Sequence, residues 1–160
     1  KAVQVLEQYL ETDNNTDTRL HLASLLSQSQ QTTQAKKHYL QVLKEDPQNF
    51  IALNNIAEIN LDAGEYKTAI DYAQRAAELL PDHPAILDTL GFALLQSGQT
   101  EQSIEKLEAA HETAPKDPSI RLHYALALHR SGDTFRAKEL IKDLQPIAAK
   151  QKAIVDEILN

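Results

Sequence analysis

Residues 50–83 read FIALNNIAEINLDAGEYKTAIDYAQRAAELLPDH, and residues 84–117 read PAILDTLGFALLQSGQTEQSIEKLEAAHETAPKD. Both stretches carry a glycine and a proline at matching places, and the same spacing of 34 residues continues on either side. The residues that keep this spacing are Pro47, Pro81 and Pro115 together with Gly64, Gly98 and Gly132. Two residue types that shape the backbone share one period, so the chain is predicted to repeat a single helix-turn-helix unit.

Small side chains recur at two further places in each unit. When the glycine is set at position 15, position 8 holds Ala23, Ala57, Gly91 and Ala125. Position 20 holds Ala35, Ala69, Ser103 and Ala137. Small residues at facing positions let two helices approach closely, so each unit is predicted to form a tight helical hairpin.

This pattern closely resembles the tetratricopeptide repeat family over nearly the whole chain. The resemblance implies an all-α fold, a right-handed superhelical solenoid built from antiparallel helix pairs. Two departures mark weak points. Arg19 and Arg121 stand at position 4, where the family usually has a bulky aromatic residue, and Gln30 replaces the glycine of the first unit. A left-handed backbone at Gln30 would cost about 1 kcal/mol.

The period divides the chain into predicted segments. Residues 1–15 are expected to supply only the second helix of a partial repeat, which favours a piece of a longer array. Repeats are predicted at 16–49, 50–83, 84–117 and 118–145, the last one shortened, and a capping helix at 146–160. The predicted helices are 2–12, 16–29, 33–45, 50–63, 66–80, 84–97, 100–114, 118–131, 134–145 and 147–159.

Composition argues against several classes of function. The chain has 16 Lys and Arg against 23 Asp and Glu, a net charge of −7, and its sequence shows no cluster of basic residues. Nucleic acid and anionic membrane are therefore not expected as partners. No apolar run approaches the roughly 20 residues that cross a bilayer, so this segment is not expected to insert into a membrane. The chain has no cysteine, which excludes disulfides and cysteine-based metal sites.

No catalytic motif is present, and neither an enzyme activity nor a cofactor is expected. The chain has four glycines, three of which keep the period, and it contains no phosphate-binding loop and no GxSxG motif. Glu108 and His111 have the i, i+3 spacing of a metal-ligand pair, but no second ligand set is evident, so no metal is expected. His21 and His123 share position 6, either at the edge of a groove or packed between repeats.

In the tetratricopeptide family the first helix of each unit lines a concave groove. Carrying that over predicts a partner-binding surface in which apolar side chains face solvent and polar ones fix the register of a bound segment. Its predicted residues are Asn54, Asn55, Glu58, Leu61, Asp88, Phe92, Leu95, Leu122, Leu126 and His129. An alternative is that the helix at 147–159 covers these residues. Only Asn55 fits the carboxylate clamp of the family's co-chaperones, so a carboxylate-terminated tail is not the expected ligand.

The sequence thus predicts a non-catalytic scaffold that binds a peptide or helical segment of a protein partner. Two alternatives stay open: a spacer or self-association segment of a longer array, and a regulatory module of an upstream enzyme. The run at 86–98 also resembles bacterial repeat lipoproteins of PEP-CTERM and exopolysaccharide systems. That resemblance implies a periplasmic protein anchored to the outer membrane, and without it a cytoplasmic location is expected.

Overall fold

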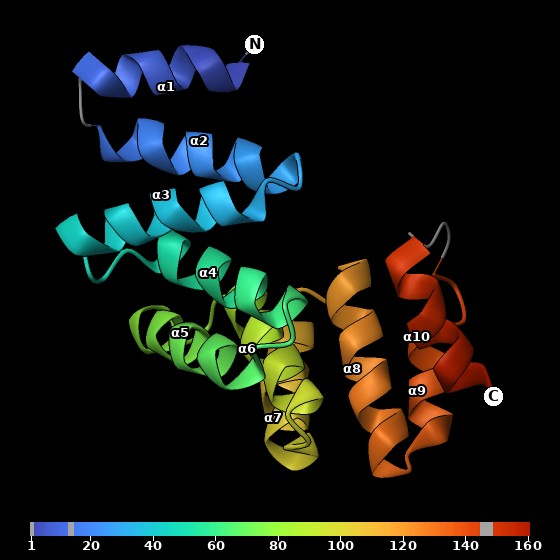
Figure 1. Cartoon of the computed structure of the whole chain (residues 1–160). Helices are drawn as coiled ribbons and strands as arrows, with labels where there is room; N and C mark the ends of the chain where they lie inside the picture. Colours follow the sequence, from blue (N-terminus) through green and yellow to red (C-terminus); the bar gives the residue numbers. More distant parts are fainter. Residues whose placement is uncertain (1, 13–14, 145–148) are drawn as a thin grey trace. The chain divides into compact units, whose positions relative to one another are not determined.

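The computed structural model describes residues 2–12, 15–144 and 149–160, and these ranges contain helices and turns but no strand (Figure 1). The chain forms two compact units, Lys1–Leu79 and Leu80–Asn160, here called the N-terminal and the C-terminal unit. The N-terminal unit contains α1 (Ala2–Thr12), α2 (Thr16–Gln28), α3 (Thr32–Glu45), α4 (Phe50–Asp62) and α5 (Tyr66–Leu79). The C-terminal unit contains α6 (Pro84–Gln96), α7 (Thr100–Thr113), α8 (Pro118–Ser131), α9 (Thr134–Ile141) and α10 (Ala149–Leu159).

The predicted helix boundaries from α1 to α8 agree with the structure to within one residue. Pro84 and Pro118 begin α6 and α8, where the missing N–H of proline costs no helical hydrogen bond. Helix α9 ends at Ile141, four residues earlier than predicted. The chain turns at Leu144, whose N–H donates to the carbonyl of Ile141 at 3.0 Å. Pro146, which follows the shortened last repeat, lies outside the described residues.

The hairpin turns share one geometry. Gly64, Gly98 and Gly132 have φ of 76°, 86° and 98°, the left-handed region that glycine enters without strain. In each turn the next residue donates its N–H to a carbonyl five residues back, the bond of a Schellman motif; for example, Glu65 donates to Asn60 at 2.8 Å. Gln30 takes the same conformation with φ of 61°, and Gln31 donates to Leu26 at 2.9 Å. Gln30 therefore has the left-handed backbone whose cost the sequence raised.

Replacing Gln30 by glycine should raise the free energy of unfolding by roughly 0.5–1 kcal/mol, because glycine removes the Cβ penalty of the left-handed conformation. Urea denaturation followed by circular dichroism measures the change. The matched control is Gln74→Gly, an exposed position inside α5, which should destabilise by about 1 kcal/mol. A loss of stability with Gln30→Gly would contradict this account of the turn.

Small residues bring the paired helices together, as predicted. In the N-terminal unit Ala23 and Ala35 are fully buried, as are Ala57 and Ala69. Around them lies a core that includes Leu22, Leu26, Tyr39, Val42 and Ile56. The core of the C-terminal unit includes Leu107, Leu122, Tyr124, Leu126 and Leu128, and it also takes in Ile158 from the last helix.

Candidate functional site

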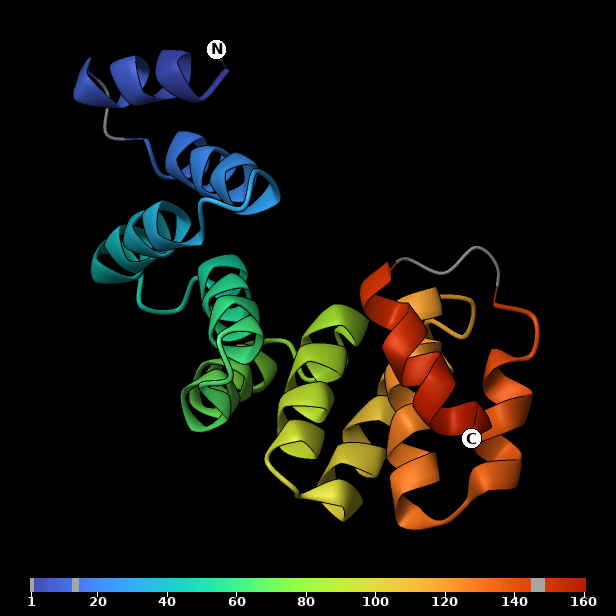
Figure 2. The same ribbon diagram turned by 45° about the vertical axis from the view of Figure 1, so that its right-hand side comes forward.

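The predicted apolar groove residues of the C-terminal unit are not exposed. Leu95, Leu122 and Leu126 have 2%, 1% and 1% of their surface exposed, and they belong to the same core as Ile158 of α10. The expectation that these leucines face solvent is wrong. Helix α10 packs on α8 and α9 (Figure 2), and its Ile158 belongs to the same core as these leucines.

Helix α10 is held by both apolar and polar contacts. Ile158 is fully buried, while Ile154 and Val155 pack against the core from partly buried positions. At one end of α10 the Arg130 Nε donates to the Glu157 carboxylate at 2.9 Å, and at the other end Gln151 donates to the Ser119 hydroxyl at 3.4 Å. Ile154 and Ile158 therefore face the core, and α10 covers the α8 face of this unit.

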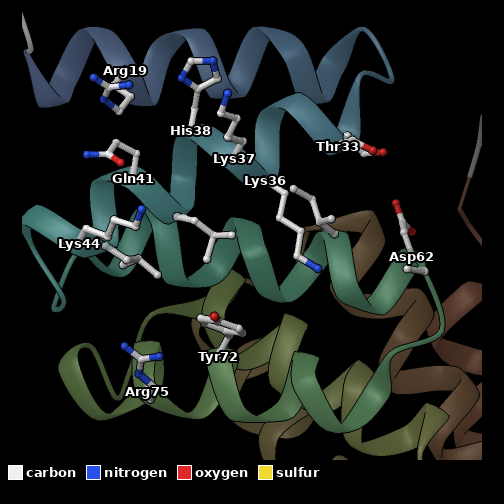
Figure 3. A pocket seen from close by; sticks show the side chains of 15 residues that line it. Arg19, Thr33, Lys36, Lys37, His38, Gln41, Lys44, Asp62, Tyr72 and Arg75 are labelled. Atoms are coloured by element: carbon white, nitrogen blue, oxygen red, sulfur yellow. The ribbon is translucent and has the colours of Figure 1, made fainter.

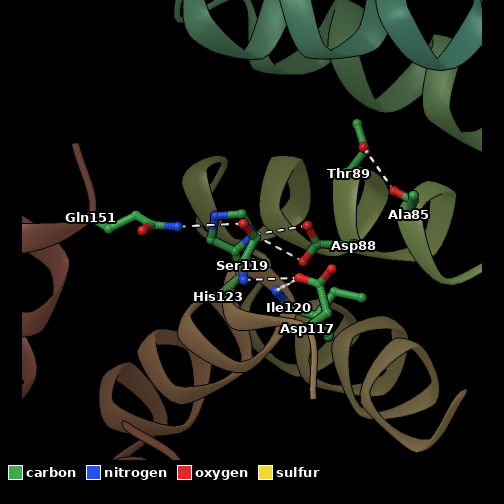
Figure 4. Close-up of polar contacts among 8 residues, drawn as sticks. All are labelled: Ala85, Asp88, Thr89, Asp117, Ser119, Ile120, His123 and Gln151. Atoms are coloured by element: carbon green, nitrogen blue, oxygen red, sulfur yellow. Dashed lines mark hydrogen bonds and ion pairs between the residues drawn. The ribbon is translucent and has the colours of Figure 1, made fainter. Parts of the chain in front are cut away.

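The predicted ligand contact Asp88 already has a partner within the fold. The Nδ1 of His123 lies 2.9 and 3.0 Å from the two oxygens of the Asp88 carboxylate (Figure 4). The ring of His123 stacks on Phe92 with centroids 3.9 Å apart and planes 8° from parallel. Asp88 and Phe92 come from α6 and His123 from α8, so the three side chains join neighbouring hairpins. Of the two expectations for His123, packing between repeats is the one observed.

The remaining predicted residue of this unit, His129, is partly buried near the end of α8. Its Nδ1 lies 3.5 Å from the hydroxyl of Thr134, the first residue of α9. This contact sits at the hairpin turn. The structure therefore gathers the predicted residues of the C-terminal unit into packing contacts.

Glu108 and His111, whose spacing suggested a pair of metal ligands, both contact Tyr124. The Tyr124 hydroxyl donates to Glu108 at 2.7 Å, and the Arg136 guanidinium donates to that same hydroxyl at 2.7 Å. Burial, followed by the Glu108 carboxylate, raises the pKa of Tyr124 to about 12. The hydrogen bond from Tyr124 holds the pKa of Glu108 below its ordinary value. Among the described residues, no group of three or more His, Asp or Glu side chains could hold a metal ion.

In the N-terminal unit, part of the predicted surface lines an open hollow of about 370 Å³ between α2 and α4, here called the α2–α4 hollow. It is lined by Ser24, Ser27, Gln28, Thr32, Asn55, Glu58, Ile59 and Asp62. Asn55 and Glu58, two of the residues predicted to bind a partner, line this hollow, and the other lining residues are polar apart from one isoleucine. The hollow combines hydroxyl, amide and carboxylate groups, which suits hydrogen bonding to a polypeptide.

The amides near this hollow are held by internal hydrogen bonds. Asn55 donates to the carbonyl of Ile51 at 2.8 Å and accepts from the Tyr39 hydroxyl at 3.0 Å. Asn54 donates to the Glu58 carboxylate at 2.8 Å. Asn54 and Leu61 are half-buried and do not line the hollow. Glu58 is thus an exposed carboxylate of this surface that also accepts a hydrogen bond within α4.

A second and larger hollow was missed by the sequence reasoning. It has a volume of about 1110 Å³ and is lined by residues of α2, α3, α4 and α5 in the N-terminal unit (Figure 3). Five basic side chains lie around it, namely Arg19, Lys36, Lys37, Lys44 and Arg75. The expectation that no basic cluster exists is therefore wrong. Lys37 and Lys44 lie two turns apart on α3 and could have signalled it, but Arg19 and Arg75 join them only in the folded unit.

None of the helices in the described ranges has the length and apolar character needed to cross a bilayer. A comparison with curated protein sequences found no significant match. Several solved structures are similar. MamA from Desulfovibrio magneticus RS-1 aligns with a TM-score of 0.77 at 19% identity, over 96% of this chain and 84% of that one. The pilF protein of Pseudomonas aeruginosa aligns with a TM-score of 0.77 at 22% identity, over 96% and 72%. These likenesses concern the fold, and they agree with the predicted helical solenoid.

Two family models, each described as tetratricopeptide repeat, match residues 20–84 and 94–156. The two matches cover parts of both units, and residues 85–93 of α6 lie between them. The phased glycines, the small residues at the helix contacts and the helix order agree with this match. The chain belongs to the tetratricopeptide repeat family, whose helical repeats act as scaffolds that bind other proteins.

Proposed function

We propose that this chain is a non-catalytic scaffold that binds a peptide or helical segment of a protein partner in the α2–α4 hollow. The observation that supports this is the hollow itself, about 370 Å³ in volume and lined almost wholly by polar side chains of two first helices. Hydroxyl and amide groups recognise the backbone of a bound segment with little dependence on its sequence. Asn55 keeps its internal hydrogen bonds and acts as a rigid wall of the site.

The charge of the hollow selects among possible segments. Glu58 and Asp62 are its two charged groups, and both are exposed carboxylates. A neutral or cationic segment gains attraction from them, whereas an acidic one is repelled. The expected ligand is therefore a neutral or basic segment.

The C-terminal unit favours a structural role instead. Helix α10 covers the residues that were expected to bind a partner, including Leu122 and Leu126. In this unit α10 packs on that surface, which supports the spacer or self-association alternative. A role in a bacterial envelope or exopolysaccharide assembly, and a link to an upstream enzyme, stay predictions from the sequence.

A peptide-display selection tests the proposal. Twelve-residue random peptides are selected on the full chain, and the affinities of the enriched peptides are measured by fluorescence anisotropy. The enriched peptides should be neutral or cationic, and Glu58→Arg should weaken their binding at least tenfold because it reverses the charge of an exposed lining residue.

The matched control is Glu78→Arg, the same charge change at an exposed position on α5 that does not line the hollow. It should leave the affinity within twofold of the unchanged protein. Equal losses for both variants, or no enriched peptide that responds to Glu58→Arg, would contradict the proposed site and favour the spacer alternative.

A further inference from the structure

The larger hollow of the N-terminal unit, here called the basic hollow, is built mainly on α3. Figure 3 shows Lys36, Lys37 and Lys44 projecting from α3, with Arg19 on α2 to one side and Arg75 on α5 to the other. The volume of about 1110 Å³ lies at the upper end of what small-molecule sites span. A hollow of that size accommodates a polypeptide segment of several residues.

The positive charge of this hollow opposes the charge of the unit around it. The N-terminal unit has 7 Lys and Arg against 11 Asp and Glu, yet five of those seven cations line the basic hollow. Asp62 is the one carboxylate among its lining residues. An otherwise acidic unit thus presents one local surface on which negative charge is attracted.

The cations differ in how firmly the fold holds them. Lys36 donates to the Asn60 side chain at 2.7 Å and lies 3.6 Å from the Glu65 carboxylate. Arg75 lies over the Tyr72 ring, 5.3 Å from its centroid. Lys37 and Lys44, both exposed, form no ion pair with any residue that the structure describes. These two ammonium groups are the ones left to meet a ligand.

The partly buried His38 adds a further feature. The Nδ1 of His38 is buried and has no hydrogen-bond partner among the described residues, and His38 lines the hollow. Burial and, next, the charge of Arg19 keep the pKa of His38 below its ordinary value, so the ring is neutral at neutral pH. A buried polar atom without a partner is costly.

Apolar side chains also line the hollow. Leu40 is 37% exposed, and Leu43, Ile59 and Tyr72 are partly buried beside it. An inorganic anion would leave these groups in contact with water. A segment that carries both carboxylates and apolar side chains would pair with the lysines and bury the leucines at the same time.

We propose that the basic hollow binds an acidic, partly apolar segment of a protein partner. The segment's carboxylates pair with Lys37 and Lys44, and its apolar side chains pack on Leu40 and Leu43. This is a second binding surface, and its charge preference is opposite to that of the α2–α4 hollow. Glu58 lines only the smaller hollow, so the two proposals are tested by different variants.

The probe is a fluorescein-labelled peptide in which Glu-Glu-Leu is repeated four times, titrated with the full chain. It should bind, and the double variant Lys37→Glu with Lys44→Glu should weaken binding at least tenfold. The matched control is Lys67→Glu with Lys116→Glu, which makes the same change in net charge at exposed positions outside the hollow. It should weaken binding less than threefold, and Glu58→Arg should not weaken it at all.

Other results would overturn the proposal. Absence of peptide binding would do so directly, and equal losses in the two double variants would show unspecific attraction to charge. If a peptide made only of glutamate binds as tightly as the probe, apolar side chains do not contribute to binding. If inorganic triphosphate displaces the probe, the hollow is a phosphate site. If the chain self-associates and the Lys37→Glu with Lys44→Glu variant does not, the occupant is a second copy of this chain. Circular dichroism confirms that each variant is folded.

Discussion

Replacing Leu126 by alanine is expected to lower the free energy of unfolding by about 2–5 kcal/mol, the range for removing a buried leucine side chain. Leu126 is 1% exposed in a core shared by α8 and Ile158 of α10. The truncation removes apolar surface from this core and leaves a cavity, since helices on both sides hold their positions. Urea denaturation followed by circular dichroism measures the loss.

Phe135→Ala is the control for this substitution. Phe135 lies on α9 in the same unit and is 78% exposed, so its loss should change stability by about 0.5 kcal/mol or less. A Leu126→Ala variant as stable as the control would mean that α10 does not cover α8 in solution. The concave surface of the C-terminal unit would then be open, as the sequence first suggested.

Replacing Gly91 by valine is expected to destabilise the chain by about 3 kcal/mol, at the upper end of the usual cost of overpacking. A Cβ built on Gly91 would lie 2.6 Å from the Leu107 Cγ and 3.3 Å from the Leu107 backbone nitrogen. Leu107 is fully buried, so it cannot move away without disturbing the core between α6 and α7. Thermal and urea denaturation give the change in stability.

A glycine with a different role provides the comparison. Gly98 has φ of 86° and nothing within 4 Å of a Cβ built on it, so Gly98→Ala should cost only about 1 kcal/mol through backbone strain. The crowding at Gly91 can be isolated with a double variant: Gly91→Val with Leu107→Ala should cost less than the sum of the two single changes. Strict additivity would show that Leu107 is not the residue that excludes a side chain at Gly91.

The two binding sites proposed in the N-terminal unit prefer segments of opposite charge. The α2–α4 hollow presents Glu58, and the basic hollow presents Lys37 and Lys44. A scaffold of this design could hold two differently charged segments at once. Both hollows are lined by Thr32, Ile59 and Asp62. A segment bound in one hollow would therefore contact side chains that also line the other.

Local features of the fold were predictable because they depend on near neighbours in the sequence. A glycine every 34 residues indicated where each first helix ends, and Gln30, which occupies the same position in the first unit, has the same left-handed backbone. Small residues at Ala57 and Ala69 indicated where helices touch, and both are fully buried. A repeat makes such signals strong, since each one is seen several times in phase.

The site was less predictable, because the repeat assigns a helix face to each residue but not what lies against that face. Asn55 and Glu58 line a hollow as expected, whereas Leu122 and Leu126 are covered by α10, a helix outside the repeat pattern. Asp88 has the phase of a ligand contact but pairs with His123, 35 residues away. A polar side chain can bind a ligand only if no other residue of the fold already pairs with it. The period of the sequence does not specify such pairings.

The sequence by itself determined the helices, their turns and their membership of a tetratricopeptide array, because backbone conformation and hydrophobic phase are local properties that recur in every unit. Only the tertiary structure decided which surfaces stay open. It brought Arg19 and Arg75 beside the lysines of α3 to form the basic hollow, and it laid α10 over the leucines of α8. Both results come from contacts between helices far apart in the chain, where packing and charge act through space rather than along the sequence.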